Sequence, residues 1–189
     1  MIIKAADLSN ASSIFESFFD SVKEQTSKLG TNIDTFRNDS SFKTKFKSDG
    51  YDAARNYMGI YIAALDKLNT VCDTTLNNII SANNSVISAM AGYSEIDLSK
   101  RSEIENRLQQ LKTDLANTYA ELNATTSKST QYSCKQAIYK LEQDITEMEK
   151  YLTIIKNTET AYNSAKGLIG GDVSSTIQGF STLIGNFCK

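Results

Sequence analysis

Cysteine and the carboxylates are the residue types that could do chemistry in this chain, because histidine and tryptophan are absent. Cysteine occurs at Cys72, Cys134 and Cys188. Zinc sites are built from cysteine and histidine, usually with a Cys-x-x-Cys pair, and this sequence offers neither histidine nor such a pair. We therefore expect no metal site and no cofactor.

Two of the cysteines fall on apolar stripes of predicted helices. Leucine or isoleucine occupies the neighbouring stripe positions of both Cys72 and Cys134, so we interpret them as small buried hydrophobic side chains. A Cys72–Cys134 disulfide is the alternative, because separation along the sequence says nothing about proximity in space.

Carboxylates gather on one predicted helix, at Glu142, Asp144, Glu147 and Glu149. They fall on its polar side among interleaved basic residues, which is typical of a solvated face. The patterns Gly-x-x-x-x-Gly-Lys-Ser/Thr and Gly-x-Ser-x-Gly are both absent. The sequence therefore predicts no catalytic residue, and we expect the protein not to be an enzyme.

The composition is that of a folded protein with a balanced surface. Hydrophobic residues make up 40% of the chain and charged residues 22%, which are ordinary values. The net charge of -2 gives no broad field to attract nucleic acid. No stretch approaches the roughly 18 apolar residues of a membrane span, and the first residues do not resemble a secretory signal peptide.

Helical periodicity organises almost the whole sequence, and proline is absent. The first predicted helix begins near Asp7 or Leu8, with Gly30 as a candidate interruption. Residues 37–49 are mostly polar and form the first predicted irregular region. The apolar stripe of the helix comprises Leu8, Ala11, Phe15, Phe18, Val22, Leu29, Ile33 and Phe36.

The second predicted helix, from about Gly50 to Ala91, is expected to be the longest. Its apolar positions recur at steps of three or four residues, close to a heptad repeat. It would span roughly 60 Å, and the first helix is expected to be too short to cover all of its stripe. The stripe comprises Ala54, Met58, Tyr61, Leu65, Leu68, Cys72, Leu76, Ile79, Asn83, Val86 and Met90.

Partner contacts are expected along this stripe, because an amphipathic helix of this length must bury its apolar face. Asn83 is a polar residue within the stripe. It either fixes the register of a helical pair or marks a locally solvated spot. The predicted partner-binding residues are Met58, Tyr61, Leu65, Leu68, Leu76 and Ile79.

Two further helices are predicted later in the chain. The third carries Ile104 and Leu111 on its stripe, the fourth carries Ile138 and Ile145, and a polar loop at residues 123–130 connects them. Similar lengths and a short connection favour an antiparallel hairpin. We expect an all-α fold, an elongated antiparallel bundle of helical hairpins with one very long central helix.

The last residues differ in composition. Between Gly167 and Phe187, glycines are mixed with Ile, Leu, Val and Phe, which predicts a flexible link followed by a short docking helix from Val173 to Phe187. A helix that inserts in or leans on a membrane is the alternative. We therefore divide the chain into a helical domain at residues 1–166 and a Gly-rich tail or docking helix at residues 167–189.

The break between the first two helices holds glycine, alanine and aromatic residues at fixed offsets. Gly50 permits close approach or a positive φ where the chain reverses. Phe46 and Tyr57 flank it and provide apolar area to close the hairpin tip. The residues of this turn motif are Phe46, Ser48, Gly50, Ala53, Arg55 and Tyr57.

This turn motif resembles that of the LXG domain, the amino-terminal region of effectors of the bacterial type VII secretion system, which is related to the WXG superfamily. The family pattern has an apolar residue two places before a glycine, then Gly-x-x-Ala followed by a basic residue and an aromatic. Phe46 stands at a leucine position and Ser48 at a glycine position. The matching residues are Gly50, Ala53, Arg55 and Tyr57.

The resemblance implies a module for targeting and interaction. Such domains bind small helical partner proteins, and the assembled bundle is read by the type VII secretion ATPase. The protein would be made in the bacterial cytoplasm and secreted without a cleavable signal peptide. It would be either the targeting region of a longer toxin effector or a stand-alone member of the family.

Tyr93 and Asp97 form a Tyr-x-x-x-Asp pattern just after the second predicted helix. In secreted pairs of the WXG type such a pattern is part of the export signal, so the resemblance makes these residues the candidate export motif. The alternative is a loop in which Asp97 caps the third helix and Tyr93 packs on a helix end.

Membrane activity is the second functional hypothesis. The tail from Gly167 to Phe187 would then perturb bilayers, although contact with a membrane is less favoured than contact with protein partners. The two hypotheses differ in an observable result, because only membrane activity predicts leakage of liposomes that depends on this tail.

Overall fold

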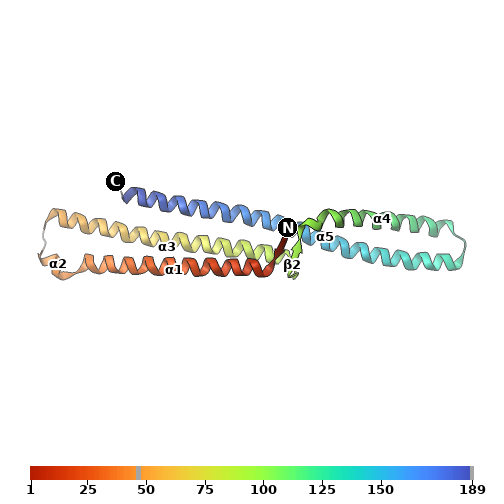
Figure 1. Cartoon of the computed structure of the whole chain (residues 1–189), viewed down its shortest axis with the longest axis horizontal. Helices are drawn as coiled ribbons and strands as arrows, with labels where there is room; N and C mark the ends of the chain where they lie inside the picture. The colour runs from red at the N-terminus through yellow and green to blue at the C-terminus, as the bar shows by residue number, and fades with distance from the viewer. Residues whose placement is uncertain (46–47, 188–189) are drawn as a thin grey trace. The chain divides into compact units, whose positions relative to one another are not determined.

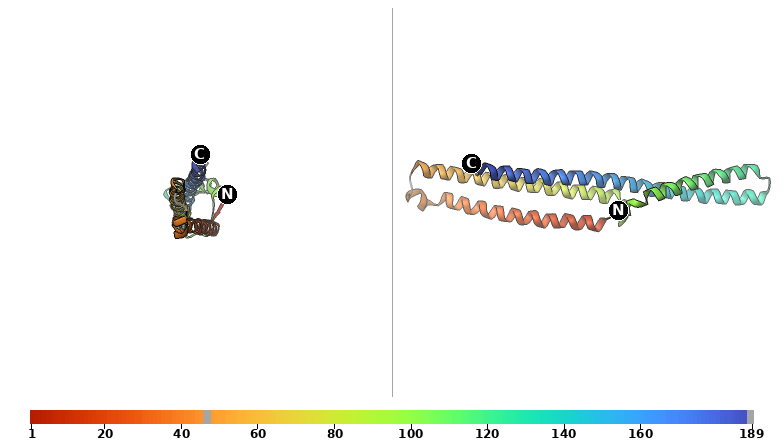
Figure 2. Two further views of the ribbon diagram at one scale, coloured as in Figure 1. Left: turned by 90° about the vertical axis from the view of Figure 1, so that its left-hand side faces the viewer. Right: turned by 45° about the horizontal axis from the view of Figure 1, so that its top comes forward.

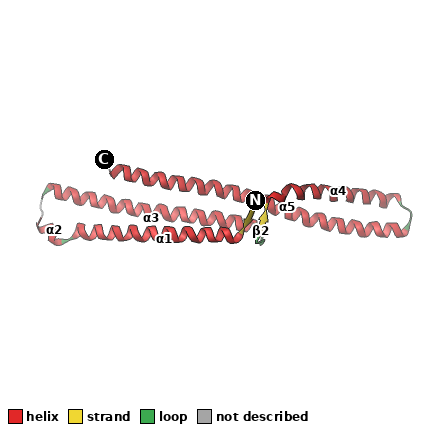
Figure 3. Ribbon diagram, viewed as in Figure 1, coloured by secondary structure: helices red, strands yellow, loops and turns green. Residues whose placement is uncertain are grey.

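Helices make up about 90% of the computed structural model, so the predicted all-α class is confirmed. The model describes the backbone of residues 1–45 and 48–187, and all of their side chains except those of residues 42, 43, 173, 177, 180, 181 and 183–187. Figures 1 and 3 show the elements in chain order. They are β1 (Ile2–Lys4), α1 (Ala5–Asn38), α2 (Ser40–Lys45), α3 (Asp49–Ala89), β2 (Glu95–Asp97), a 3-10 turn (Leu98–Lys100), α4 (Arg101–Ala124) and α5 (Lys128–Phe187).

Two compact units divide the chain, and the long helices pass from one to the other. Unit 1 comprises Met1–Leu8 and Ser85–Asn163, and unit 2 comprises Ser9–Asn84 and Ser164–Lys189. Each unit therefore combines stretches that are far apart in the sequence.

In unit 2, α1 and α3 form an antiparallel hairpin, and polar contacts hold its register (Figures 1 and 2). Asn83 is buried, and its side-chain amide donates to Ser12 Oγ at 2.9 Å. Farther along the hairpin, Lys23 Nζ donates to Asp73 at 2.6 Å. Asn83 therefore contributes to the register of the helical pair, and the alternative of a solvated spot is wrong.

The core of unit 2 lies where α5 joins this hairpin. Phe19 of α1 packs with Cys72, Leu76 and Ile79 of α3, and Ile169 of α5 packs against this cluster. Thr176 of α5 is buried as well, and its hydroxyl hydrogen-bonds that of Thr75 at 2.9 Å. In this part of unit 2 the stripe of α3 is therefore covered by α1 and α5 together.

Glycine does not interrupt α1 or α5, contrary to the sequence-based prediction. Gly30 lies inside α1, and Gly167 inside α5, which at 60 residues is longer than α3 at 41. An interior glycine costs about 1 kcal/mol relative to alanine, which the burial of neighbours such as Ile169 and Thr176 offsets. The longest helix is therefore α5, and its carboxyl-terminal part, from Ser164 on, belongs to unit 2 and continues the same helix without a flexible link.

In unit 1, α4 and the first part of α5 form the predicted antiparallel hairpin (Figure 1). Its core cluster contains Leu108 and Leu111 from α4 together with Ile145 and Leu152 from α5. Ion pairs follow one edge of the hairpin. They join Arg101 to Glu159 at 2.7 Å, Glu105 to Lys156 at 2.9 Å and Lys112 to Glu149 at 2.7 Å.

A two-stranded antiparallel ribbon, which the sequence did not predict, ties the first residues to unit 1. Ile3 of β1 pairs with Ile96 of β2, and both side chains are buried. The chain reaches β2 through a tight turn in which Gly92 has a φ of 88°, a conformation that glycine adopts at little cost. The ribbon is too short to show a clear alternation of apolar and polar residues.

Replacing Ile79 by alanine should lower the free energy of unfolding by about 2–5 kcal/mol, because it removes a fully buried side chain and leaves a cavity. The matched control is Ile60→Ala on the same helix, where the side chain is 57% exposed and the change should stay within about 0.5 kcal/mol. Urea unfolding followed by circular dichroism measures both. Equal effects at the two positions would contradict the core described for unit 2.

Candidate functional site

The turn motif lies at the start of α3, and Gly50 does not have the predicted backbone role. Gly50 belongs to the first turn of this helix, and a Cβ there would meet no atom within 4 Å. The positive φ among the described glycines belongs to Gly92 instead. The prediction of close approach or positive φ at Gly50 is therefore wrong, because α3 begins one residue earlier, at Asp49.

The other residues of the turn motif lie at the surface or near it. Ser48 precedes α3, and its Oγ accepts a hydrogen bond from the backbone N–H of Tyr51 at 3.3 Å. Ala53 is exposed, and Tyr57 is 66% exposed and does not close the hairpin tip as predicted. Phe46 and Cys188 lie outside the described residues.

Burial of the predicted partner-binding residues decreases toward the start of α3. Leu76 and Ile79 pack inside unit 2 itself, Leu65 and Leu68 are half-buried, and Tyr61 is 39% exposed. At the exposed end there is an apolar groove of about 350 Å³, which we call the hairpin groove. Its lining residues are Asn32, Ile33, Phe36, Met58 and Tyr61.

A second apolar surface, the α1 strip, consists mostly of residues of the predicted stripe that the structure leaves exposed. Its residues are separated by 4, 11 and 7 positions, which are close to whole turns of a helix, so they share one face. The predicted stripe placed Phe18 in the core, whereas Phe19 is buried and Phe18 is exposed. The α1 strip consists of Ile14, Phe18, Leu29 and Phe36, which are 69%, 59%, 50% and 44% exposed.

Asp97 of the candidate export motif has a structural role. Its carboxylate accepts hydrogen bonds from the backbone N–H of Ser99 at 3.0 Å and from the Ser99 hydroxyl at 2.6 Å. These hydrogen bonds lower the pKa of Asp97 below its ordinary value. Asp97 is the N-cap of the 3-10 turn that leads into α4, so the capping role predicted as the alternative is present.

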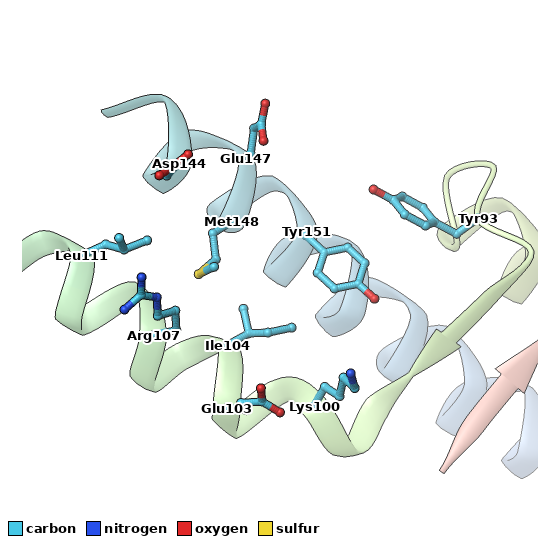
Figure 4. Close-up of a pocket in the computed structure, with 10 residues that line it drawn as sticks. All are labelled: Tyr93, Lys100, Glu103, Ile104, Arg107, Leu111, Asp144, Glu147, Met148 and Tyr151. Carbon is cyan, nitrogen blue, oxygen red and sulfur yellow. The ribbon is translucent and has the colours of Figure 1, made fainter. Parts of the chain in front are cut away.

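Tyr93, the other residue of the candidate motif, stands at one end of a groove (Figure 4). It is 47% exposed, and its ring centroid lies 5.4 Å from that of Tyr151. We call this groove, of about 570 Å³, the tyrosine groove. Its lining residues are Tyr93, Lys100, Glu103, Ile104, Arg107, Leu111, Asp144, Glu147, Met148 and Tyr151.

The tyrosine groove combines apolar and charged side chains from two helices (Figure 4). The basic residues are Lys100 of the 3-10 turn and Arg107 of α4, and α5 contributes the acidic residues Asp144 and Glu147. A surface of this kind can contact a protein segment through both apolar and charged groups. The sequence could not reveal it, because the groove forms only when α4 and α5 align.

Cys72 and Cys134 are both free and buried, as the interpretation of small hydrophobic side chains requires. Because neither cysteine is paired among the described residues, the alternative of a Cys72–Cys134 disulfide is wrong. Burial raises the pKa of the Cys72 thiol, which disfavours the reactive thiolate.

Comparisons with models of known families, with curated proteins and with solved structures find no match for this chain. Among the described residues, no helix is both long and apolar enough to cross a membrane.

Replacing Asp97 by asparagine should lower the stability of unit 1 near neutral pH, because the ionised carboxylate is the better acceptor for Ser99. Folding lowers the pKa of Asp97. Its ionised carboxylate therefore adds to the free energy of unfolding at pH values above its ordinary pKa of 3.8, and this gain is lost as the pH falls through the pKa of the folded state. The gap in stability between wild type and Asp97→Asn should therefore shrink in acid.

Urea unfolding midpoints of wild type and variant, measured from about pH 7 down to about pH 3, test this dependence. Asp144→Asn is the control, since it removes a carboxylate of the same unit that caps no helix. A gap that stays constant or widens on acidification would contradict the role assigned to the Asp97 carboxylate.

Proposed function

We propose that this chain is the secretion-targeting and partner-binding module of a type VII secretion effector, which binds small helical partner proteins for export. The turn motif supports this proposal through its resemblance to the LXG domain. The observation that carries it is the α1 strip, an apolar surface on a helix whose other face is already used within unit 2.

The α1 strip supports binding of a helix because of its shape and chemistry. Ile14, Phe18 and Leu29 are each at least half exposed and repeat along one helix face. Several large apolar side chains exposed on one helix face favour an interaction site. A partner helix lying along α1 would bury these side chains in the manner of a helical bundle.

The hairpin groove supports the same proposal from the other end of α1. Ile33 and Met58 line it from different helices of the hairpin, and its walls are almost entirely apolar. A side chain from a partner helix could insert there, as apolar anchor residues do at helix-in-groove interfaces. Met58 and Tyr61 are the predicted partner-binding residues that remain accessible for this contact.

For recognition by the secretion ATPase we propose Tyr93 rather than the Tyr93–Asp97 pair. Tyr93 is exposed and lies on the tyrosine groove, whereas the carboxylate of Asp97 is engaged by Ser99. Tyrosine provides a large contact area together with a hydrogen-bonding hydroxyl, which suits it to an interface. Asp97 would then act indirectly, by holding the start of α4.

Replacing Phe18 by serine should weaken binding of the helical partner by about tenfold or more, since burial of an aromatic at an interface is commonly worth over 1.4 kcal/mol. Tyr139→Ser is the matched control, because Tyr139 is 62% exposed on α5 and lies outside the α1 strip. The measurement is co-purification and calorimetry with small helical proteins encoded beside this gene.

Both variants should keep the wild-type circular dichroism spectrum. Wild-type affinity of Phe18→Ser would remove the α1 strip from the interface. Failure of every neighbouring helical protein to bind wild type, together with leakage of liposomes, would instead favour membrane activity.

Replacing Tyr93 by alanine should leave the fold intact and lower the amount of protein exported. In the native host, immunoblots of cell pellet and culture medium measure this. Tyr132→Ala provides the control, because Tyr132 is a tyrosine of the same unit, 68% exposed, that does not line the tyrosine groove. Export that continues when the type VII ATPase is deleted would contradict the whole proposal.

A further inference from the structure

A polar pocket of about 260 Å³ lies in unit 2, where α1 ends and α3 begins, and two arginines line it. Arg37 comes from the last turn of α1, and Arg55 comes from the second turn of α3. Asn38, Asp52 and Asn56 complete the lining. We call it the arginine pocket.

The two guanidinium groups are only loosely paired with acids of the chain. Arg37 Nη1 lies 3.9 Å from Asp34, and Arg55 Nη1 lies 3.6 Å from Asp52. Both distances exceed the 2.7–3.2 Å range of an N–H···O hydrogen bond. Both acids are also more than half exposed, at 54% and 74%, so water screens much of their attraction.

One guanidinium nitrogen of Arg55 makes no hydrogen bond within the part of the chain that the structure describes. Its side chain is 21% exposed, and among the described residues its buried Nη2 atom has no hydrogen-bond partner. Bringing two such cations to one pocket is unfavourable unless negative charge approaches them.

Gly59 provides a recess for the second guanidinium group. A Cβ at this position would lie 3.3 Å from both Cζ and Nη2 of Arg37 and 3.5 Å from its Nη1. The planar head of Arg37 therefore rests against α3 at Gly59, where the absence of a side chain leaves room for it. This contact holds Arg37 on the same pocket as Arg55.

We propose that the arginine pocket binds an oxyanion, a carboxylate or a phosphate group, between Arg37 and Arg55. Guanidinium groups donate paired N–H bonds to such oxygens and stay charged at any physiological pH. The amide of Asn56 adds a donor from the same wall. This site is independent of the apolar surfaces of the proposed function and does not require the protein to be exported.

The test is a titration of the full chain with phosphate, with acetate and with chloride at constant ionic strength, followed by NMR of the arginine Nε–Hε groups. Saturable shifts of Arg37 and Arg55 with phosphate or acetate, but not with chloride, are expected. The anion that binds more tightly identifies the class of ligand. Shifts that never saturate, or that chloride reproduces, would overturn the proposal.

Two variants separate the pocket from general electrostatics. Arg55→Gln should weaken oxyanion binding by about tenfold or more, and Arg107→Gln removes the same charge from unit 1 as a control. Wild-type binding by folded Arg55→Gln would overturn the proposal.

Discussion

The apolar stripe of α3 is the constraint on which unit 2 depends. A helix of 41 residues cannot keep such a stripe in water, and most of its stability must come from packing against neighbours. α1 covers one side of the stripe and the carboxyl-terminal part of α5 reaches the other, through Phe19 and Ile169 respectively. This requirement also explains why α5 continues through glycines that would weaken an isolated helix.

Apolar packing alone tolerates sliding of one helix past another, and polar contacts select the register. Asn83 meets Ser12 across the hairpin, and Thr75 meets Thr176 of α5. A shift of one helical turn would separate these partners and leave buried polar groups without hydrogen bonds, which is costly. In the α4–α5 hairpin of unit 1, cross-helix ion pairs contribute to the same selection.

The alignment of the helices determines which residues remain for function. Phe18 and Phe19 are adjacent and therefore point about 100° apart around α1, so only one of them can enter the core. The other extends the α1 strip. In the same way, the alignment of α1 with α3 brings Arg37 and Arg55 to one pocket, and the alignment of α4 with α5 forms the tyrosine groove.

Periodicity and the absence of proline predicted the helical class, the approximate limits of α3 and the α4–α5 hairpin. A repeat of three to four residues shows which side chains share one face of a helix. The same repeat predicted the burial of Cys72, Ile79 and Val86. It could not state which neighbour covers that face. The tertiary structure alone decided that Phe19 rather than Phe18 is buried and that Ile169 of α5 packs against the core of unit 2. These outcomes depend on contacts between distant segments, which a local pattern of residue types does not encode.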